Sequence, residues 1–175
     1  YPVFAEAFAS TLPKGGAELT EQFSQSYLSL NRKLAERAPW TLAHQDYRVE
    51  NMLFGDVSTD QVVVIDWQGI GRGPGAYDLA YLLGGSMDTD LRRAHERELV
   101  AAYQARLADH GVEDYSVESA WEDYGFAHLL GGLATSIFAG GTLDLSNERG
   151  VELITMMANR HVTAALDHGG FKDLS

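Results

Sequence analysis

The apolar residues of this chain recur mainly at helical spacing. Between residues 19 and 34 they stand three or four positions apart, which predicts a helix with one buried stripe that Pro39 ends. The residues of this stripe are Leu19, Phe23, Tyr27, Leu30 and Leu34. Similar patterns predict helices at 76–84, 88–110, 116–139 and 148–168, with Gly111 as a stop signal and Ser116 and Ser146 as amino-terminal caps.

One stretch departs from the helical spacing. The segment QVVVID, residues 61–66, is a continuous β-branched run that predicts a short buried strand. It follows NMLF, residues 51–54, after the polar, turn-forming stretch GDVSTD, so the two segments are predicted to form a hairpin. The expected fold is therefore α+β and mostly helical, a single domain over 1–175 with one small hairpin after the first long helix.

Composition narrows the functional classes. A net charge of −12 argues against a nucleic-acid-binding protein, which would carry a basic face. The absence of cysteine excludes thiolate chemistry and a disulfide scaffold, and it fits a reducing compartment. No apolar run reaches the ~20 residues of a membrane span, so we expect no membrane span and a cytoplasmic protein.

One polar segment lies between two apolar flanks. HQDYRVEN, residues 44–51, separates TLA from MLF, and groups held this close to a core need partners in the protein or in a ligand. The predicted hairpin brings Asn51, at its start, near Asp66, at its end, and the loop adds Asp46. Carboxylate and amide oxygens suit Mg²⁺, which usually shares its ligands with substrate phosphates. The arrangement favours phosphoryl transfer.

Three segments together resemble a kinase family. HQDYRVEN resembles the His-x-Asp-x-x-x-x-Asn loop shared by protein kinases and the aminoglycoside phosphotransferase/choline kinase group. VVVIDWQ resembles the metal-binding strand that follows it, and GPGAYDLAYLLGG resembles the Tyr-Asp-Leu-Ala helix of aminoglycoside phosphotransferases. Within this group the narrower resemblance is to the ecdysteroid-kinase-like proteins. The resemblance implies the carboxy-terminal lobe of a protein-kinase-like fold, with the hairpin carrying the catalytic loop.

The resemblance also implies a role for individual residues. Asp46 corresponds to the catalytic base that accepts or orients the proton of the substrate hydroxyl. Asn51 and Asp66 would hold Mg²⁺ on the phosphates of ATP, the co-substrate. His44 and Asp78 would support the loop without contacting the substrate. Each of these residues, taken alone, is also compatible with a turn, a cap or a structural role.

Two residues near the loop remain open. Arg48 is a candidate catalytic residue that could stabilise charge on the transferring phosphate, and it could equally be solvated or paired with Glu50. Gln68 faces the same alternatives.

The nucleotide-binding half of such a kinase is not evident in the chain. No Gly-rich loop and no strand lysine precede His44, and the chain begins at Tyr1. We therefore expect 1–175 to be the carboxy-terminal lobe alone, with the amino-terminal lobe of the same protein as its missing partner, and the isolated fragment to be inactive. The acceptor would be a hydroxyl of a small molecule bound by the later helices, whose acidic and aromatic residues do not choose between a cationic and a steroid-like compound.

Two alternatives compete with the enzyme. The first is a catalytically silent kinase-like module that binds a nucleotide or a partner. The second is a helical interaction domain in which the polar loop is structural, and it predicts that neither Mg²⁺ nor nucleotide affects melting.

Overall fold

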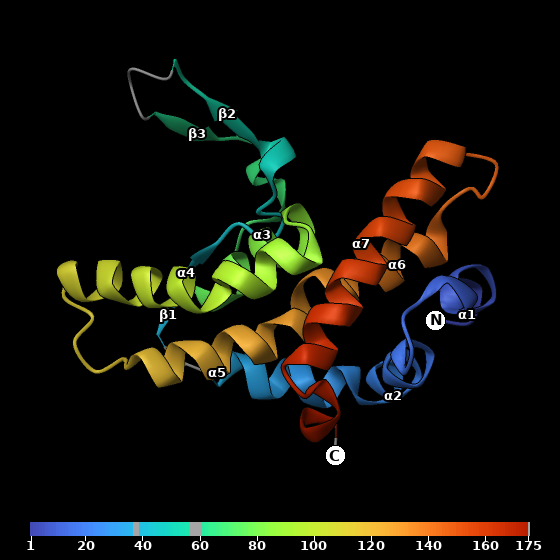
Figure 1. Ribbon diagram of the computed structural model, residues 1–175, viewed down its shortest axis with the longest axis horizontal. Coiled ribbons are helices and arrows are strands. Elements are labelled where there is room, and N and C mark those ends of the chain that lie inside the picture. Colours follow the sequence, from blue (N-terminus) through green and yellow to red (C-terminus); the bar gives the residue numbers. More distant parts are fainter. Residues whose placement is uncertain (37–38, 57–60, 175) are drawn as a thin grey trace.

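The fold is a body of helices from which one small hairpin projects (Figure 1). It is known from a computed structural model that describes residues 1–36, 39–56 and 61–174. The α-helices are α1 (Pro2–Phe8), α2 (Gly16–Ala35), α3 (Ala76–Ser86), α4 (Thr89–Asp109), α5 (Val117–His128), α6 (Ala134–Thr142) and α7 (Glu148–Asp167). Short 3₁₀ turns lie at Ala9–Thr11, Val49–Asn51, Trp67–Gly69 and Gly170–Asp173. None of the helices in these ranges has the length and apolarity that crossing a lipid bilayer demands. The prediction of a mostly helical α+β fold is confirmed.

The strands form two separate antiparallel pairs. Strands β2 (Met52–Phe54) and β3 (Val62–Val64) make the predicted hairpin, with Leu53 opposite Val63. Strands β1 (Trp40–Ala43) and β4 (Gly71–Pro74) make a second pair that the sequence did not predict. Strand β4 was not predicted because it contains Gly71, Gly73 and Pro74, and glycine and proline are usually depleted in strands.

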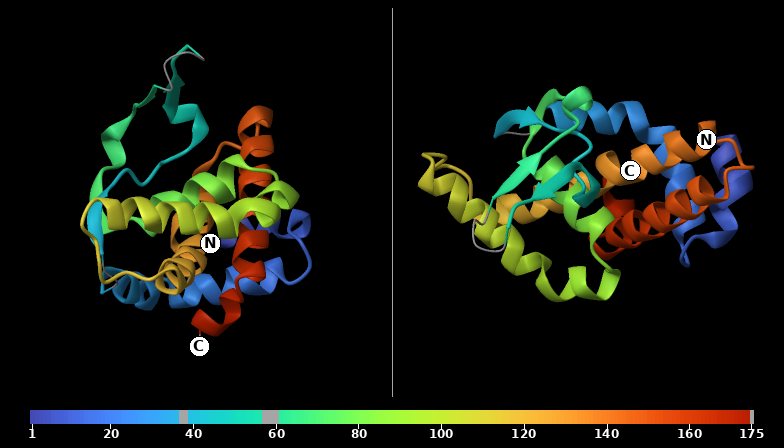
Figure 2. Two further views of the ribbon diagram at one scale, coloured as in Figure 1. Left: turned by 60° about the vertical axis from the view of Figure 1, so that its left-hand side comes forward. Right: turned by 90° about the horizontal axis from the view of Figure 1, so that it is seen from above.

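The prediction that the second hairpin strand is buried is wrong. Val62 and Val63 are 49% and 55% exposed, and Leu53 and Phe54 on the partner strand are 55% and 63% exposed. The left view of Figure 2 shows the hairpin rising beyond the helices, so no described layer covers it. A two-stranded ribbon supplies its own backbone hydrogen bonds, but it has no second layer of its own in which to bury apolar side chains.

The helix predicted at 116–139 is interrupted. Its α-helical turns are α5 and α6, and Leu129–Leu133 between them form a π-helix. Ser116 caps α5 as predicted, since its hydroxyl oxygen accepts a hydrogen bond from the Ser119 N–H at 3.0 Å. The cap predicted at Ser146 is wrong by one residue. Asn147 caps α7 through Gly150 N–H, while the Ser146 hydroxyl bonds to Asp144.

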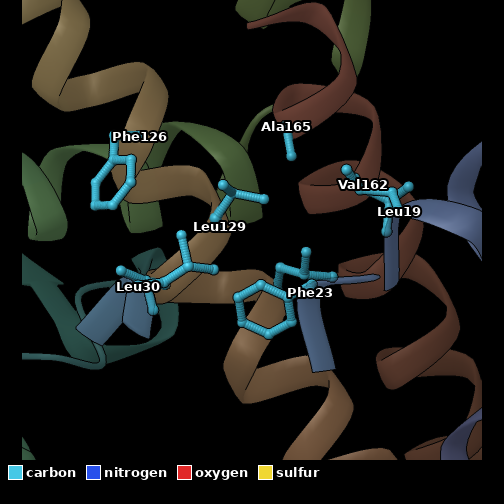
Figure 3. Close-up of a cluster of buried hydrophobic side chains, with 9 residues drawn as sticks. Leu19, Phe23, Leu30, Phe126, Leu129, Val162 and Ala165 are labelled. Atoms are coloured by element: carbon cyan, nitrogen blue, oxygen red, sulfur yellow. The ribbon is translucent and has the colours of Figure 1, made fainter. Parts of the chain in front are cut away.

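The main core lies where α2, the π-helix and α7 meet (Figure 3). The stripe predicted on α2 contributes Leu19, Phe23 and Leu30, and all three are buried. Facing residues come from α5 and the π-helix and from α7: Phe126, Leu129, Leu130, Leu133, Val162 and Ala165. Burying large side chains of this kind stabilises a fold by about 1.5–3 kcal/mol each.

Two histidines lie in the interior beside this core. His128, at the end of α5, and His161, in α7, have no solvent exposure. The His161 ring occupies a space that glycine leaves open, since a Cβ on Gly132 would lie 1.8 Å from its Nε2 and one on Gly84 2.7 Å from its Nδ1. Burial and nearby positive charge lower the pKa of His161 to about 3, and they hold the pKa of His128 well below its usual range.

These histidines predict a loss of stability in mild acid. In the unfolded chain both titrate near pH ~6.5, so below that pH the unfolded state binds protons that the folded state does not. Each histidine should lower the free energy of unfolding by up to about 1.4 kcal/mol per pH unit between pH ~6 and ~5, above the pH ~4 at which most unfolded-chain carboxylates are half protonated. Urea unfolding in metal-free buffer measures this slope. His161→Leu should reduce the slope by the contribution of one bound proton, up to about 1.4 kcal/mol per pH unit. His110→Gln, which changes an exposed histidine, should leave the slope unchanged. An unchanged slope in His161→Leu would contradict the assignment.

Candidate functional site

The segment 44–51 connects β1 to the hairpin and is fixed at its first residue. His44 is buried, and its Nε2 donates to the carbonyl of Ile65 at 2.8 Å. Its Nδ1 accepts from the Asp46 N–H at 3.3 Å, so the two contacts together select the tautomer with the proton on Nε2. The rings of His44 and Trp67 lie 4.8 Å apart between centroids. His44 therefore joins the loop to the end of β3.

A single carboxylate on α3 holds the backbone of the same loop. Asp78 Oδ2 accepts the backbone N–H of His44 at 2.7 Å, and Oδ1 accepts that of Gln45 at 2.9 Å. Burial raises the pKa of Asp78, and the two N–H groups oppose this rise by favouring the ionised form. The contacts explain why an acidic residue occurs in an otherwise apolar helix.

The carboxylate of Asp46 is held on both oxygens. Oδ2 accepts a hydrogen bond from Asn51 Nδ2 at 2.9 Å, and Oδ1 accepts one from the Tyr81 hydroxyl at 2.9 Å. Arg48 Nε lies 3.4 Å from Oδ1 as an ion pair. The structure thus brings three of the predicted site residues together, and it pairs Arg48 with Asp46 while Glu50 is exposed.

Tyr81 was not predicted as a site residue. It is 1% exposed, and burial, followed by the charge of Asp46, raises its pKa, so the hydroxyl keeps its proton. A signal was present in the sequence: Tyr81 follows Asp78 by three residues, so the two share one face of α3. The tyrosine could equally have been a core residue, and only the position of the loop separates the two interpretations.

Asp66 comes to the same end of the hairpin through the backbone. The carbonyl of Asn51 accepts the N–H of Ile65 at 2.9 Å, which places Asp66 one residue beyond the pair. Asp66 is exposed, and Gln68 is exposed in the 3₁₀ turn that follows. The arrangement predicted from the hairpin therefore holds for the backbone of both residues.

Two left-handed residues flank the site. Asp66 and Gln45 have φ of 64° and 67°, and among the described residues other than glycine only these two have positive φ. Such conformations cost free energy and concentrate at functional sites. Gln45 also lies over β4, where a Cβ on Gly71 would stand 2.1 Å from its Nε2.

The oxygen atoms at this spot fit a hard cation. Asn51 uses its amide nitrogen on Asp46, so its Oδ1 is the atom that remains for a ligand. Asp66 adds an exposed carboxylate. Two protein oxygen donors are too few to hold Mg²⁺ alone, but they suit a cation that also binds phosphate oxygens and water.

Comparison with known proteins gives one family. The family model described as ecdysteroid kinase-like matches residues 3–113, a range that contains His44, Asp46, Asn51, Asp66 and Asp78. The searches of the curated proteins and of the solved structures found no match.

The contacts of Asp78 predict a loop that loosens when the carboxylate is removed. Asp78→Ala should lower the free energy of unfolding by about 1–3 kcal/mol, the usual cost of losing a buried hydrogen-bonding partner. It should also speed hydrogen exchange at the amides of His44 and Gln45. Asp109→Ala, at the exposed end of α4, serves as the control and should do neither. Unchanged exchange at the two amides would show that Asp78 does not hold the loop.

Proposed function

The chain belongs to the ecdysteroid kinase-like family, and on this premise we propose that it is the carboxy-terminal lobe of a small-molecule kinase. The reaction is ATP- and Mg²⁺-dependent transfer of a phosphoryl group to a hydroxyl. The observation that carries the proposal is the Asp46 carboxylate, which Asn51 and Tyr81 fix on a loop pinned by Asp78.

Asp46 serves as the catalytic base. Oδ2 accepts a hydrogen bond from Asn51 and keeps a further lone pair for the acceptor hydroxyl, while Oδ1 faces Tyr81 and Arg48. A base fixed in this way pays little entropy to reach the reacting geometry, which is a main source of rate in phosphoryl transfer.

Asn51 and Asp66 are the residues that would hold Mg²⁺ with the nucleotide phosphates. When bound, the cation offsets the negative charge of the phosphates. The chain's own contribution is to bring the two residues to the same end of the hairpin, through the pairing of Asn51 with Ile65, next to the left-handed backbone at Asp66.

Arg48 lies beside the base and is assigned to the transferring phosphate. Its Nε is buried and makes no hydrogen bond to a described residue, while the ion pair with Asp46 keeps the guanidinium at the site. A guanidinium can turn from a carboxylate to a phosphate with little loss of binding energy. The planar carboxylate and the tetrahedral phosphate each accept two parallel N–H groups.

The exposed hairpin supports a second lobe. Apolar side chains on β2 and β3 meet no described layer, and more apolar residues are exposed on β1 and in the segment after β3: Trp40, Leu42, Ile65, Trp67 and Ile70. A surface of this kind usually marks an interface. We assign it to the nucleotide-binding lobe, without which residues 1–175 should bind acceptor but not turn it over.

Two variants separate the metal site from the base. In the protein that carries both lobes, Asp66→Ala should abolish Mg²⁺-dependent binding of ATP, because half of the protein oxygens are lost. Asp46→Asn should leave that binding near normal and lower kcat by ~10² to 10⁴, the usual contribution of a positioned base. Calorimetric titration and steady-state kinetics on both variants test the split. Normal kcat in Asp46→Asn, or unchanged ATP affinity in Asp66→Ala, would refute the assignment concerned.

Tyr81 should hold the Asp46 carboxylate in its catalytic position. Its hydroxyl donates to Asp46 Oδ1 at 2.9 Å, so Tyr81→Phe should leave the carboxylate free to turn and should lower kcat while the affinity for ATP–Mg²⁺ stays near normal. A hydrogen bond to a charged group is worth about 1.5–3 kcal/mol, which corresponds to a loss of rate of roughly 10- to 100-fold. Tyr115→Phe removes a similar tyrosine–aspartate bond, to Asp123 at 2.9 Å, away from the site and should leave kcat unchanged. An unchanged kcat in Tyr81→Phe would reduce Tyr81 to a packing residue.

A further inference from the structure

A second cluster of polar side chains lies outside the candidate active site. Glu96 on α4, His128 at the end of α5 and His168 just beyond α7 each place one oxygen or nitrogen within 4.8 Å of the others. Glu96 and His128 are buried, and the side chain of His168 is 7% exposed. The phosphotransferase chemistry proposed above uses none of the three.

His128 is the member of the cluster that the fold leaves unsatisfied. Its ring has no solvent exposure, and neither Nδ1 nor Nε2 has a hydrogen-bond partner among the described residues. The nearest aromatic neighbours, Tyr124 and His168, present ring faces and edges at centroid distances of 4.5 and 5.4 Å. A buried polar group without a partner costs about 1–3 kcal/mol, and a ligand at this point would remove that cost.

We propose that Glu96, His128 and His168 bind a divalent transition-metal ion of the Zn²⁺ class. Two imidazoles and one carboxylate are a frequent zinc donor set, and Mg²⁺ and Ca²⁺ prefer oxygen donors. His168 Nε2 and Glu96 Oε2 are 3.2 Å apart, so the imidazole and the carboxylate already lie side by side. His128 supplies the third donor, and the fourth position is left for water.

The surroundings hold the carboxylate as a metal ligand requires. Tyr124 donates to Glu96 Oε2 at 3.0 Å, and Arg92 pairs with the same oxygen. Both contacts orient the carboxylate and leave Oε1 without a hydrogen bond to any described residue, so that oxygen can face the ion. Arg92 also pairs with Asp167, which offsets part of its positive charge and pairs with Arg93 as well.

The proposed ion would link helical segments that hydrogen bonds and ion pairs between side chains already join. Glu96, His128 and His168 come from three separate helical segments, α4, α5 and the turn that ends α7. His168 is the partly accessible member, so the ion would enter at the carboxy-terminal end of α7. The site would therefore be structural, and it stands whether or not the chain is a kinase.

Metal titration of the purified chain tests the site directly. After removal of metal with a chelator, Zn²⁺ should bind with a stoichiometry of one and raise the melting temperature. Co²⁺ bound in its place should give the intense visible absorption of a tetrahedral ion with nitrogen ligands. Mg²⁺ in large excess should not compete. No saturable Zn²⁺ binding, or a weak octahedral Co²⁺ spectrum, would overturn the proposal without reference to any variant.

Two ligand variants locate the ion. His168→Gln and Glu96→Gln should each weaken Zn²⁺ binding by more than ~100-fold, because even loss of a supporting hydrogen bond costs 10- to 100-fold. His95→Gln replaces an exposed histidine next to Glu96 in the sequence and should bind as the unaltered chain does. His168→Gln changes the most accessible ligand and is the variant expected to keep the fold. Unchanged affinity in either folded ligand variant would place the ion elsewhere and overturn the assignment.

Discussion

The rest of the site depends on the two hydrogen bonds that the Asp78 carboxylate accepts from the backbone of the loop. A loop that leaves a strand loses the partners of its N–H groups, and these groups need acceptors wherever the loop is held close to a core. Asp78 supplies both oxygens, to His44 and to Gln45. The loop therefore takes its position from α3, a helix packed between its neighbours, and not from the small strands. Tyr81 lies about one turn further along the same helix and fixes the carboxylate of Asp46.

Much of this arrangement follows from the sequence. The stripe on α2, the hairpin and the stop at Gly111 all depend on local patterns, and local patterns survive folding. The convergence of Asn51 with Asp66 needs only the hairpin, because antiparallel pairing fixes which residues lie opposite one another. The support by Asp78 came from the family resemblance, and the structure supplies its physical reason, the two backbone N–H groups.

The features that the sequence did not indicate depend on contacts between distant segments. Strand β4 depends on β1, whose paired residues lie 28 to 34 positions earlier in the chain, and the glycines of β4 carry no strand signal of their own. Tyr81 and the buried histidines look like ordinary helix residues until α3, α5 and α7 are packed together. The exposed hairpin is the opposite case: its apolar pattern predicts burial, and the described part of the chain offers nothing to cover it. A second lobe packed on the hairpin would bury these side chains, as their apolar pattern predicts.

The left-handed backbone at Gln45 sets stability against precision next to the proposed base. Glycine would adopt this conformation with less strain, so glycine at position 45 would stabilise the loop backbone. The exposed Gln45 side chain ends over Gly71, and it can turn away if a larger residue occupies position 71, so no clash fixes glutamine at position 45. Glycine at position 45 would also loosen the residue next to Asp46. Selection for stability and selection for a fixed base therefore act on position 45 in opposite directions.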